Sequence, residues 1–135
     1  MAWRLVAQGV VMNGYVTNIE HDTLENEDYR RVLFTGPNTQ LVLMTLQPGE
    51  EIGVEDHEGH DQFIRIESGN GVVLLNGREH ALADGSAVVI PSGVEHNVIN
   101  RSKDTPLRLY TLYSPPEHPD GTVQHTKAEA AAHRS

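Results

Sequence analysis

The sequence predicts one all-β domain, a sandwich or barrel of about eight short strands. Short stretches of alternating apolar and polar residues predict the strands, turn signals separate them at intervals of roughly 8–12 residues, and no long helical pattern interrupts them. A chain of 135 residues is long enough to build one sizeable core. We expect an N-terminal arm with the first strand or strands over 1–29, the barrel over 30–115 and a tail over 116–135.

The first half of the barrel has three turn and strand signals. The runs "RVLFTG" and "TQLVLMTLQPG" flank Gly36-Pro37-Asn38, which is a hairpin signal. The run "QFIRIESGNG" alternates and places Gln62, Ile64 and Ile66 on one face of a strand. Asn76-Gly77 separates two further short runs and is typical of a type I′ turn.

The second half continues in the same way. The run "SAVVIPSG" predicts a short buried strand that ends at a proline turn, and "HNVINRS" places His96, Val98 and Asn100 on one face. The last strand, "LRLYTLYSPP", is expected to stop at Pro115-Pro116. The stretch "TKAEAAAHRS" predicts a short C-terminal helix followed by a frayed terminus.

Composition excludes several classes of function. The net charge of −9 argues against binding to nucleic acid or to anionic membranes, because both need clustered lysine and arginine. The absence of cysteine excludes disulfides, zinc–thiolate sites, iron–sulfur clusters and cysteine nucleophiles. No apolar run approaches the ~18 residues of a membrane helix, and we find no signal peptide, so we expect a cytoplasmic protein.

The stretch "VEDHEGHDQFIR" at 54–65 contains the candidate metal ligands. Residues two apart on a strand share a face, so Glu55 and His57 are expected to project together and Asp56 to project away. Gln62 begins an apolar inward face and His96 begins a second one. These four side chains offer two imidazole nitrogens and two oxygens, a set that suits a divalent first-row metal.

Two spacings in the chain resemble the motifs of the cupin family. Gly49 is followed by five residues, Glu55, one residue, His57, four residues, Gln62, six residues and Gly69, where the family has Gly, His, His, Glu and Gly. The second motif keeps every interval and every residue of the family pattern. Its members here are Gly85, Pro91, Gly93, His96 and Asn100. Two motifs that are met together make a specific signal.

The resemblance implies a cupin-type β-barrel, that is, a double-stranded β-helix or jelly roll, with a metal at its mouth held by the matching residues. Glu55 stands where the family commonly has histidine, and Gln62 stands where it commonly has glutamate. The exchange leaves the charge of the set unchanged and removes one imidazole, which favours manganese, iron or nickel, with zinc also accepted. Gln62 either ligates the metal directly or orients a ligand or a bound water.

The C-terminal third resembles small single-domain bacterial cupins that are loosely grouped with mannose-6-phosphate isomerases. That grouping says little about activity, since function depends on the site and not on the fold. A metal with four protein ligands keeps one or two open positions, so we expect the protein to bind or transform a small polar metabolite, a sugar or an oxo or hydroxy acid, at this metal by isomerisation, decarboxylation or dioxygenation. The alternatives are a non-catalytic module that binds a metal or small ligand and a structural barrel with a vestigial site. No catalytic residue is assigned.

Other residues receive structural interpretations. We expect Asp56, Glu58, His60 and Asp61 to face water, and His118 and His125 to lie in an exposed tail. A tyrosine of the last strand, Tyr110 or Tyr113, is a candidate for the cavity wall. The apolar N-terminal arm around Trp3 is expected to pack on a partner subunit and so to form a homodimer.

Overall fold

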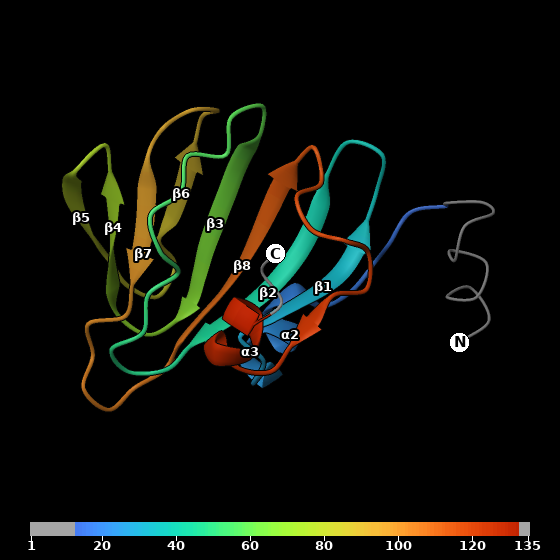
Figure 1. The fold of residues 1–135 in the computed structure, drawn as a ribbon. Helices are drawn as coiled ribbons and strands as arrows, with labels where there is room; N and C mark the ends of the chain where they lie inside the picture. The colour runs from blue at the N-terminus through green and yellow to red at the C-terminus, as the bar shows by residue number, and fades with distance from the viewer. Residues whose placement is uncertain (1–12, 133–135) are drawn as a thin grey trace.

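Two antiparallel β-sheets face each other in the computed structural model, which describes residues 13–132 (Figure 1). The larger sheet has the order β6-β3-β8-β2-β1-β9, and the smaller has the order β5-β4-β7. The strands are β1 (Arg30–Thr35), β2 (Gln40–Leu46), β3 (Asp61–Ser68), β4 (Gly71–Leu75), β5 (Arg78–Leu82), β6 (Ala87–Ile90), β7 (His96–Ile99), β8 (Leu107–Ser114) and β9 (Val123–Gln124). The all-β fold predicted from alternation and turn signals is confirmed.

The core lies between the two sheets and follows the predicted alternation. On β3, Gln62, Ile64 and Ile66 are buried while the residues between them are half-buried. The inward residues of β2, β8, β4 and β7 complete one cluster that includes Met44, Leu109, Val73 and Val98. Burial of these apolar side chains between two layers is the main force that holds the sheets face to face.

Turn residues hold the strands in this arrangement. Asn76 and Gly77, between β4 and β5, have φ angles of 49° and 82°, the positive pair that a type I′ turn requires. Gly69 has a φ of 109°, and a Cβ there would lie 2.6 Å from the carbonyl oxygen of Pro106. Asn100 is fully buried and its side chain donates to the carbonyl oxygens of Leu46 and Thr105, so it braces a turn.

The segments that flank the barrel within residues 13–132 agree with the prediction only in part. Among residues 13–29 there is no strand; instead Ile19–Glu25 forms the helix α2, which begins at Asn18, whose side chain accepts from the amide of His21. The predicted short C-terminal helix is confirmed as α3 (Lys127–Ala132). The tail also contributes strand β9, which pairs with β1. This strand has only two residues, too few to show an alternating pattern in the sequence.

Two further points concern the described part of the chain. No helix within residues 13–132 is both long and apolar enough to cross a bilayer. Trp3 and most of the apolar arm lie outside the described residues, so the homodimer and the boundaries 1–29, 30–115 and 116–135 stay predictions.

Candidate metal centre and adjoining cavity

Glu55 and His96 lie opposite each other because the segment between β2 and β3 runs beside β7. The amide of Glu55 donates to the carbonyl of His96 at 2.9 Å, and the amide of His96 donates to the carbonyl of Glu55 at 2.8 Å. Directly opposed residues of an antiparallel pair project to the same side. The backbone ladder therefore brings the carboxylate and the imidazole together from positions 41 residues apart in the sequence.

His57 reaches the same place for a different reason from the one predicted. The segment around it is not a regular strand, and His57 has a φ of 30°, in the left-handed region that side chains seldom adopt. A turn follows, in which the amide of His60 donates to the carbonyl of His57 at 3.0 Å. The hydroxyl of Ser92 accepts from the amide of Gly59 at 2.7 Å and ties this turn to the turn between β6 and β7. The alternation argument was thus wrong in its reason, although the two side chains do meet.

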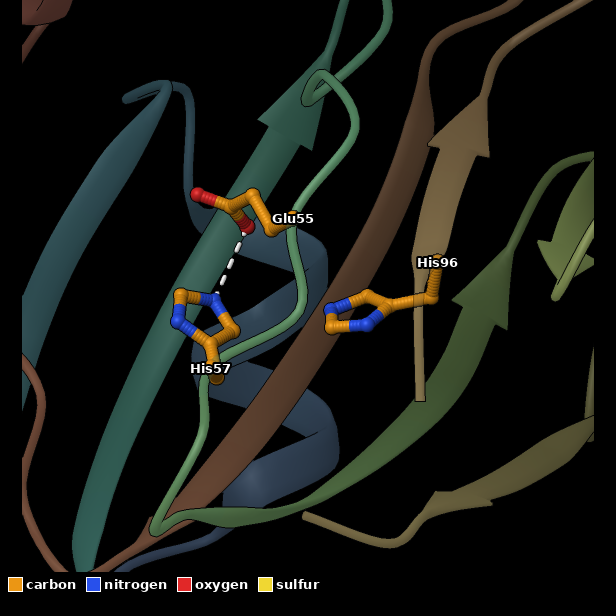
Figure 2. A group of neighbouring side chains, drawn as sticks. All are labelled: Glu55, His57 and His96. Atoms are coloured by element: carbon orange, nitrogen blue, oxygen red, sulfur yellow. Dashed lines mark hydrogen bonds and ion pairs between the residues drawn. The ribbon is translucent and has the colours of Figure 1, made fainter. Parts of the chain in front are cut away.

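The side chains of Glu55, His57 and His96 point toward one another between the sheets (Figure 2). One ligand atom from each lies within 4.8 Å of the others, and Nε2 of His57 lies 3.0 Å from Oε1 of Glu55. Two ligand atoms at right angles on one metal, with bonds of about 2.1 Å, would lie about 3 Å apart. The spacing of this pair fits metal binding.

The hydrogen bonds of the imidazoles fit as well. Nδ1 of His96 lies 2.9 Å from the carbonyl oxygen of Val94, to which it donates. Its Nε2 is buried and has no partner among the described residues. Nδ1 of His57 lies 3.4 Å from the carboxylate of Glu117, while its Nε2 faces Glu55. In both rings Nδ1 is positioned by an acceptor and Nε2 faces the cluster, the arrangement of a metal-binding histidine.

Gln62 is buried on the inward face of β3, where it lies opposite Tyr113 of β8. Its amide nitrogen donates to the hydroxyl of Thr111 at 3.0 Å, so the amide oxygen is left as an acceptor. That oxygen is buried and has no partner among residues 13–132. A buried acceptor of this kind needs a cation or a donor such as bound water, which fits either role expected for Gln62.

The charges of the cluster shift one another's ionisation. The hydrogen bond with Glu55 raises the pKa of His57, burial opposes it, and the charges of Glu55 and Glu117 add to the rise. Burial acts to raise the pKa of Glu55, but the hydrogen bond and charge of His57, with smaller effects of Arg30 and His96, lower it overall. In the absence of a metal, the pair therefore favours the imidazolium–carboxylate form.

A second group of polar residues comes from the tail that follows β8. Glu117 lies 3.4 Å from Nδ1 of His57 and 3.3 Å from Nε2 of His60. His118 packs edge-on against Tyr113, and its Nε2 is buried without a partner among the described residues. Burial, aided by the charge of Arg30, lowers the pKa of His118 to about 4, so the ring is neutral at pH 7.

Gln40, at the start of β2, holds this segment in place. It is fully buried, and its amide oxygen accepts from the backbone N–H groups of Glu117 and His118 at 3.1 and 3.0 Å. Its amide nitrogen donates to the carbonyl of His118 at 2.8 Å and to the hydroxyl of Thr35 at 2.9 Å. One side chain thus fixes the backbone of both tail residues near the cluster.

A cavity of about 430 Å³ adjoins the cluster. Ile52 and Glu55 of the β2–β3 segment form part of its wall, and Tyr29, the start of β1, the tail and α3 supply the rest. Its lining includes the polar side chains of Arg30, Glu55, Glu117, His118, Thr122, Gln124 and Lys127. This volume is within the usual range for a small-molecule site, roughly 300–1,000 Å³.

Some of the other predictions of exposure and burial are confirmed and others are wrong. Asp56, Glu58 and Asp61 are exposed, as expected, and so is His125, which pairs with Asp28 at 2.7 Å. The prediction of exposure was wrong for His60 and His118, because Glu117 and Tyr113 cover them. Tyr113 is buried and its ring packs edge-on against His57, whereas Tyr110 is half-buried against Phe63.

Comparison with known proteins identifies the fold family. The family model described as "Cupin domain" matches residues 42–113, which contain both motifs and all four predicted ligands. This chain belongs to the cupin family. The family assignment agrees with the two facing antiparallel sheets. It does not identify the metal or the ligand, which depend on the residues of the site.

Three relatives show how far the likeness extends. The uncharacterized protein YrkC of Bacillus subtilis is 47% identical over 124 residues; the match covers 87% of this cupin and 66% of that protein's length. The crystal structure of BH2720 from Bacillus halodurans is 44% identical with a TM-score of 0.84, and the match covers 89% of this cupin and 95% of that chain. A Thermotoga maritima structure described as a predicted oxalate decarboxylase is 27% identical with a TM-score of 0.54, covering 57% of this cupin and 66% of that chain.

Proposed function

We propose that this cupin holds a divalent metal ion between Glu55, His57 and His96, and that it binds or transforms a small polar metabolite in the adjoining cavity. The observation that carries the proposal is the convergence of one carboxylate oxygen and two imidazole nitrogens within 4.8 Å. The buried, unpartnered Nε2 of His96 and amide oxygen of Gln62 support it, because both need a partner that the described residues do not provide.

The donor set indicates which ions fit. Two imidazoles and one carboxylate, with the buried amide oxygen of Gln62 as a further candidate, suit manganese, iron or nickel, and zinc also accepts such ligands. Gln62 is proposed either to complete the set or to hold a water on the ion. Three or four protein ligands would leave room for an oxygen atom of the metabolite.

When bound, the ion would act as a Lewis acid toward an oxygen atom of the metabolite. The protein's own residues orient the imidazoles, since Val94 and Glu117 face the Nδ1 atoms of His96 and His57. His118 is neutral and lines the cavity, so its ring can accept a hydrogen bond from a bound ligand or donate one to it. Tyr113 packs on the rings of His57 and His118 and helps to exclude water from them.

Several reaction classes remain consistent with this arrangement. Decarboxylation, isomerisation and dioxygenation can all start from an oxygen ligand on a metal, and a non-catalytic binding module would use the same residues. The grouping with mannose-6-phosphate isomerases and the cytoplasmic location stay predictions. A panel of sugar phosphates, oxo acids and catechols, assayed with each metal, would distinguish an enzyme from a binding module.

Metal analysis of protein purified without a nickel column tests the proposal. We expect near-stoichiometric metal in the unmodified protein and loss of most of it in His57→Ala and His96→Ala. His80→Ala is the matched control, because His80 is exposed on β5 and should keep full occupancy. Absence of metal in the unmodified protein, together with no thermal shift on addition of manganese, iron, nickel or zinc, would contradict the proposal.

A further inference from the structure

The cavity contains a buried cation, Arg30, that forms no ion pair with a carboxylate of the described residues. Arg30 is only 8% exposed and shares the inward face of β1 with Val32. Its Nη1 donates to the amide oxygen of Gln124 at 2.6 Å, and its Nε is buried without a partner among residues 13–132. None of the ion pairs in the described part of the chain includes Arg30.

A buried arginine without an ion pair raises the free energy of the folded protein. A buried guanidinium loses its hydration, and this loss is recovered only when an anion pairs with it. Within residues 13–132 the guanidinium of Arg30 makes one hydrogen bond, to the neutral side chain of Gln124, and stacks at 5.2 Å on the ring of Tyr29. Neither contact supplies a counter-charge, and Glu55, whose pKa the charge of Arg30 helps to lower, forms no ion pair with it. A close anionic partner is therefore expected to come from a group that is not part of these residues.

The charge balance of the cavity points the same way. Its wall holds two cations, Arg30 and Lys127, and two carboxylates, Glu55 and Glu117. These charges cancel, and a divalent ion at Glu55 would add two positive charges. Glu117 lies near His57 and His60, so it is not available to Arg30 as a close partner. A cavity in this state favours an anionic ligand over a neutral one.

We infer that the cavity binds a small organic anion, a carboxylate or a phosphate ester, whose charged group pairs with Arg30 while another of its oxygen atoms faces the metal cluster. The metal end of this arrangement rests on the proposed function, and the Arg30 end does not. Guanidinium groups bind carboxylate and phosphate oxygens through parallel hydrogen bonds, which suits either anion. Neutral sugars lack the group that Arg30 requires.

The inference is tested by binding measurements with anions and their neutral counterparts. The probes are succinate against succinamide and glycerol 3-phosphate against glycerol, titrated calorimetrically into metal-loaded and metal-free protein. We expect at least one anion to bind ten or more times more tightly than its neutral counterpart. Succinate and glycerol 3-phosphate together distinguish a carboxylate from a phosphate site. If neither anion is preferred, the inference is wrong.

Substitutions test whether Arg30 is responsible for the preference for anions. Arg30→Gln is expected to weaken anion binding at least tenfold, and Arg31→Gln is the matched control, because Arg31 is the next residue but pairs with Asp28 outside the cavity. If anion binding persists in folded Arg30→Gln, the inference is wrong. Should that variant fail to fold, Lys127→Gln removes the other cation from α3. Weaker anion binding by Lys127→Gln would support the inference that the cavity binds anions through its cations. Unchanged binding would contradict that inference.

Measuring metal content alongside separates this inference from the proposed function. Anion binding that depends on Arg30, in a protein that takes up no metal, would keep the inference and contradict the metal site. Full metal occupancy without any preference for anions would support the metal site and contradict the inference about anion binding.

Discussion

Glu117 follows the last long strand, yet its carboxylate lies against two imidazoles, those of His57 and His60. A carboxylate on the second nitrogen of a metal-binding histidine fixes the ring and increases its basicity, and its loss typically weakens metal binding 10–100-fold. We therefore predict that Glu117→Gln raises the dissociation constant of the metal by about tenfold or more.

A metal titration with a competing chelator measures this constant. Glu58→Gln is the matched control, since Glu58 is an exposed carboxylate in the same loop as His57. Equal constants for the two variants would show that Glu117 does not position His57.

His118 gives a prediction about pH. Its pKa is lowered to about 4 in the folded protein, mainly by burial, whereas an unfolded histidine titrates near 6.5. The unfolded chain therefore binds more protons between these two values, and His118 makes the fold less stable as the pH falls through this window. In metal-free protein we expect the His118 ring resonances in NMR spectra to titrate near pH 4, with His118→Gln providing the assignment. A midpoint near pH 6.5 would contradict the burial described here.

Residues differ in how far the sequence predicts them. Motif spacing identified Glu55, His57 and His96, and these three do converge. Arg30, Glu117 and His118 were not identified, because they lie outside both motifs on β1 and in the tail, and only the folded chain brings them to the cavity. Ligation by Gln62 stays a prediction, since its free amide oxygen fits both roles considered for it.

Among the elements, β2 anchors the tail through one side chain. Gln40→Leu keeps approximately the same volume but leaves the N–H groups of Glu117 and His118 without their acceptor. Leaving such groups unsatisfied costs about 1–3 kcal/mol each when buried, and we expect a loss of about 2 kcal/mol because these are only partly buried. Urea unfolding measures the loss, and Thr39→Ala, one residue earlier at an exposed position, is the control. No difference between the variants would show that Gln40 does not hold the tail.

The elements also show where sequence patterns end. Long strands such as β3 and β8 alternate clearly and were predicted, because one face of each is buried. Helix α2 was missed, since its sequence IEHDTLE has one buried residue and no apolar stripe, and it packs against β2, β3 and β8. Strand β9 was missed because two residues cannot show a period, and its pairing with β1 is a tertiary contact.

For the whole molecule, the metal is expected to stabilise the fold, because its ligands come from the β2–β3 loop and from β7, which unfolding would separate. Metal at 100 times its dissociation constant would add about 2.7 kcal/mol, or roughly 10 °C in Tm for a domain of this size. Calorimetry with metal, and again after a chelator, measures the shift. A Tm that does not respond to metal or chelator would contradict a site built from these parts of the fold.

The same linkage predicts metal release in acid. A bound imidazole must be deprotonated, and the hydrogen bond that His57 donates to Glu55 raises the pKa of His57, so protons compete with the metal from a higher pH than at an ordinary histidine. Occupancy is expected to fall steadily as the pH is lowered from about 7.5 to about 5. Equilibrium dialysis across this range measures it, and constant occupancy would argue against two histidine ligands.

The most direct measurement of the central claim is anomalous diffraction at the absorption edge of the bound metal, in crystals grown with manganese, iron, nickel or zinc. The account predicts one strong peak between the sheets, about 2.0–2.3 Å from Nε2 of His57, Nε2 of His96 and a carboxylate oxygen of Glu55. A peak elsewhere, or none in crystals whose dissolved protein also contains no metal, would contradict it.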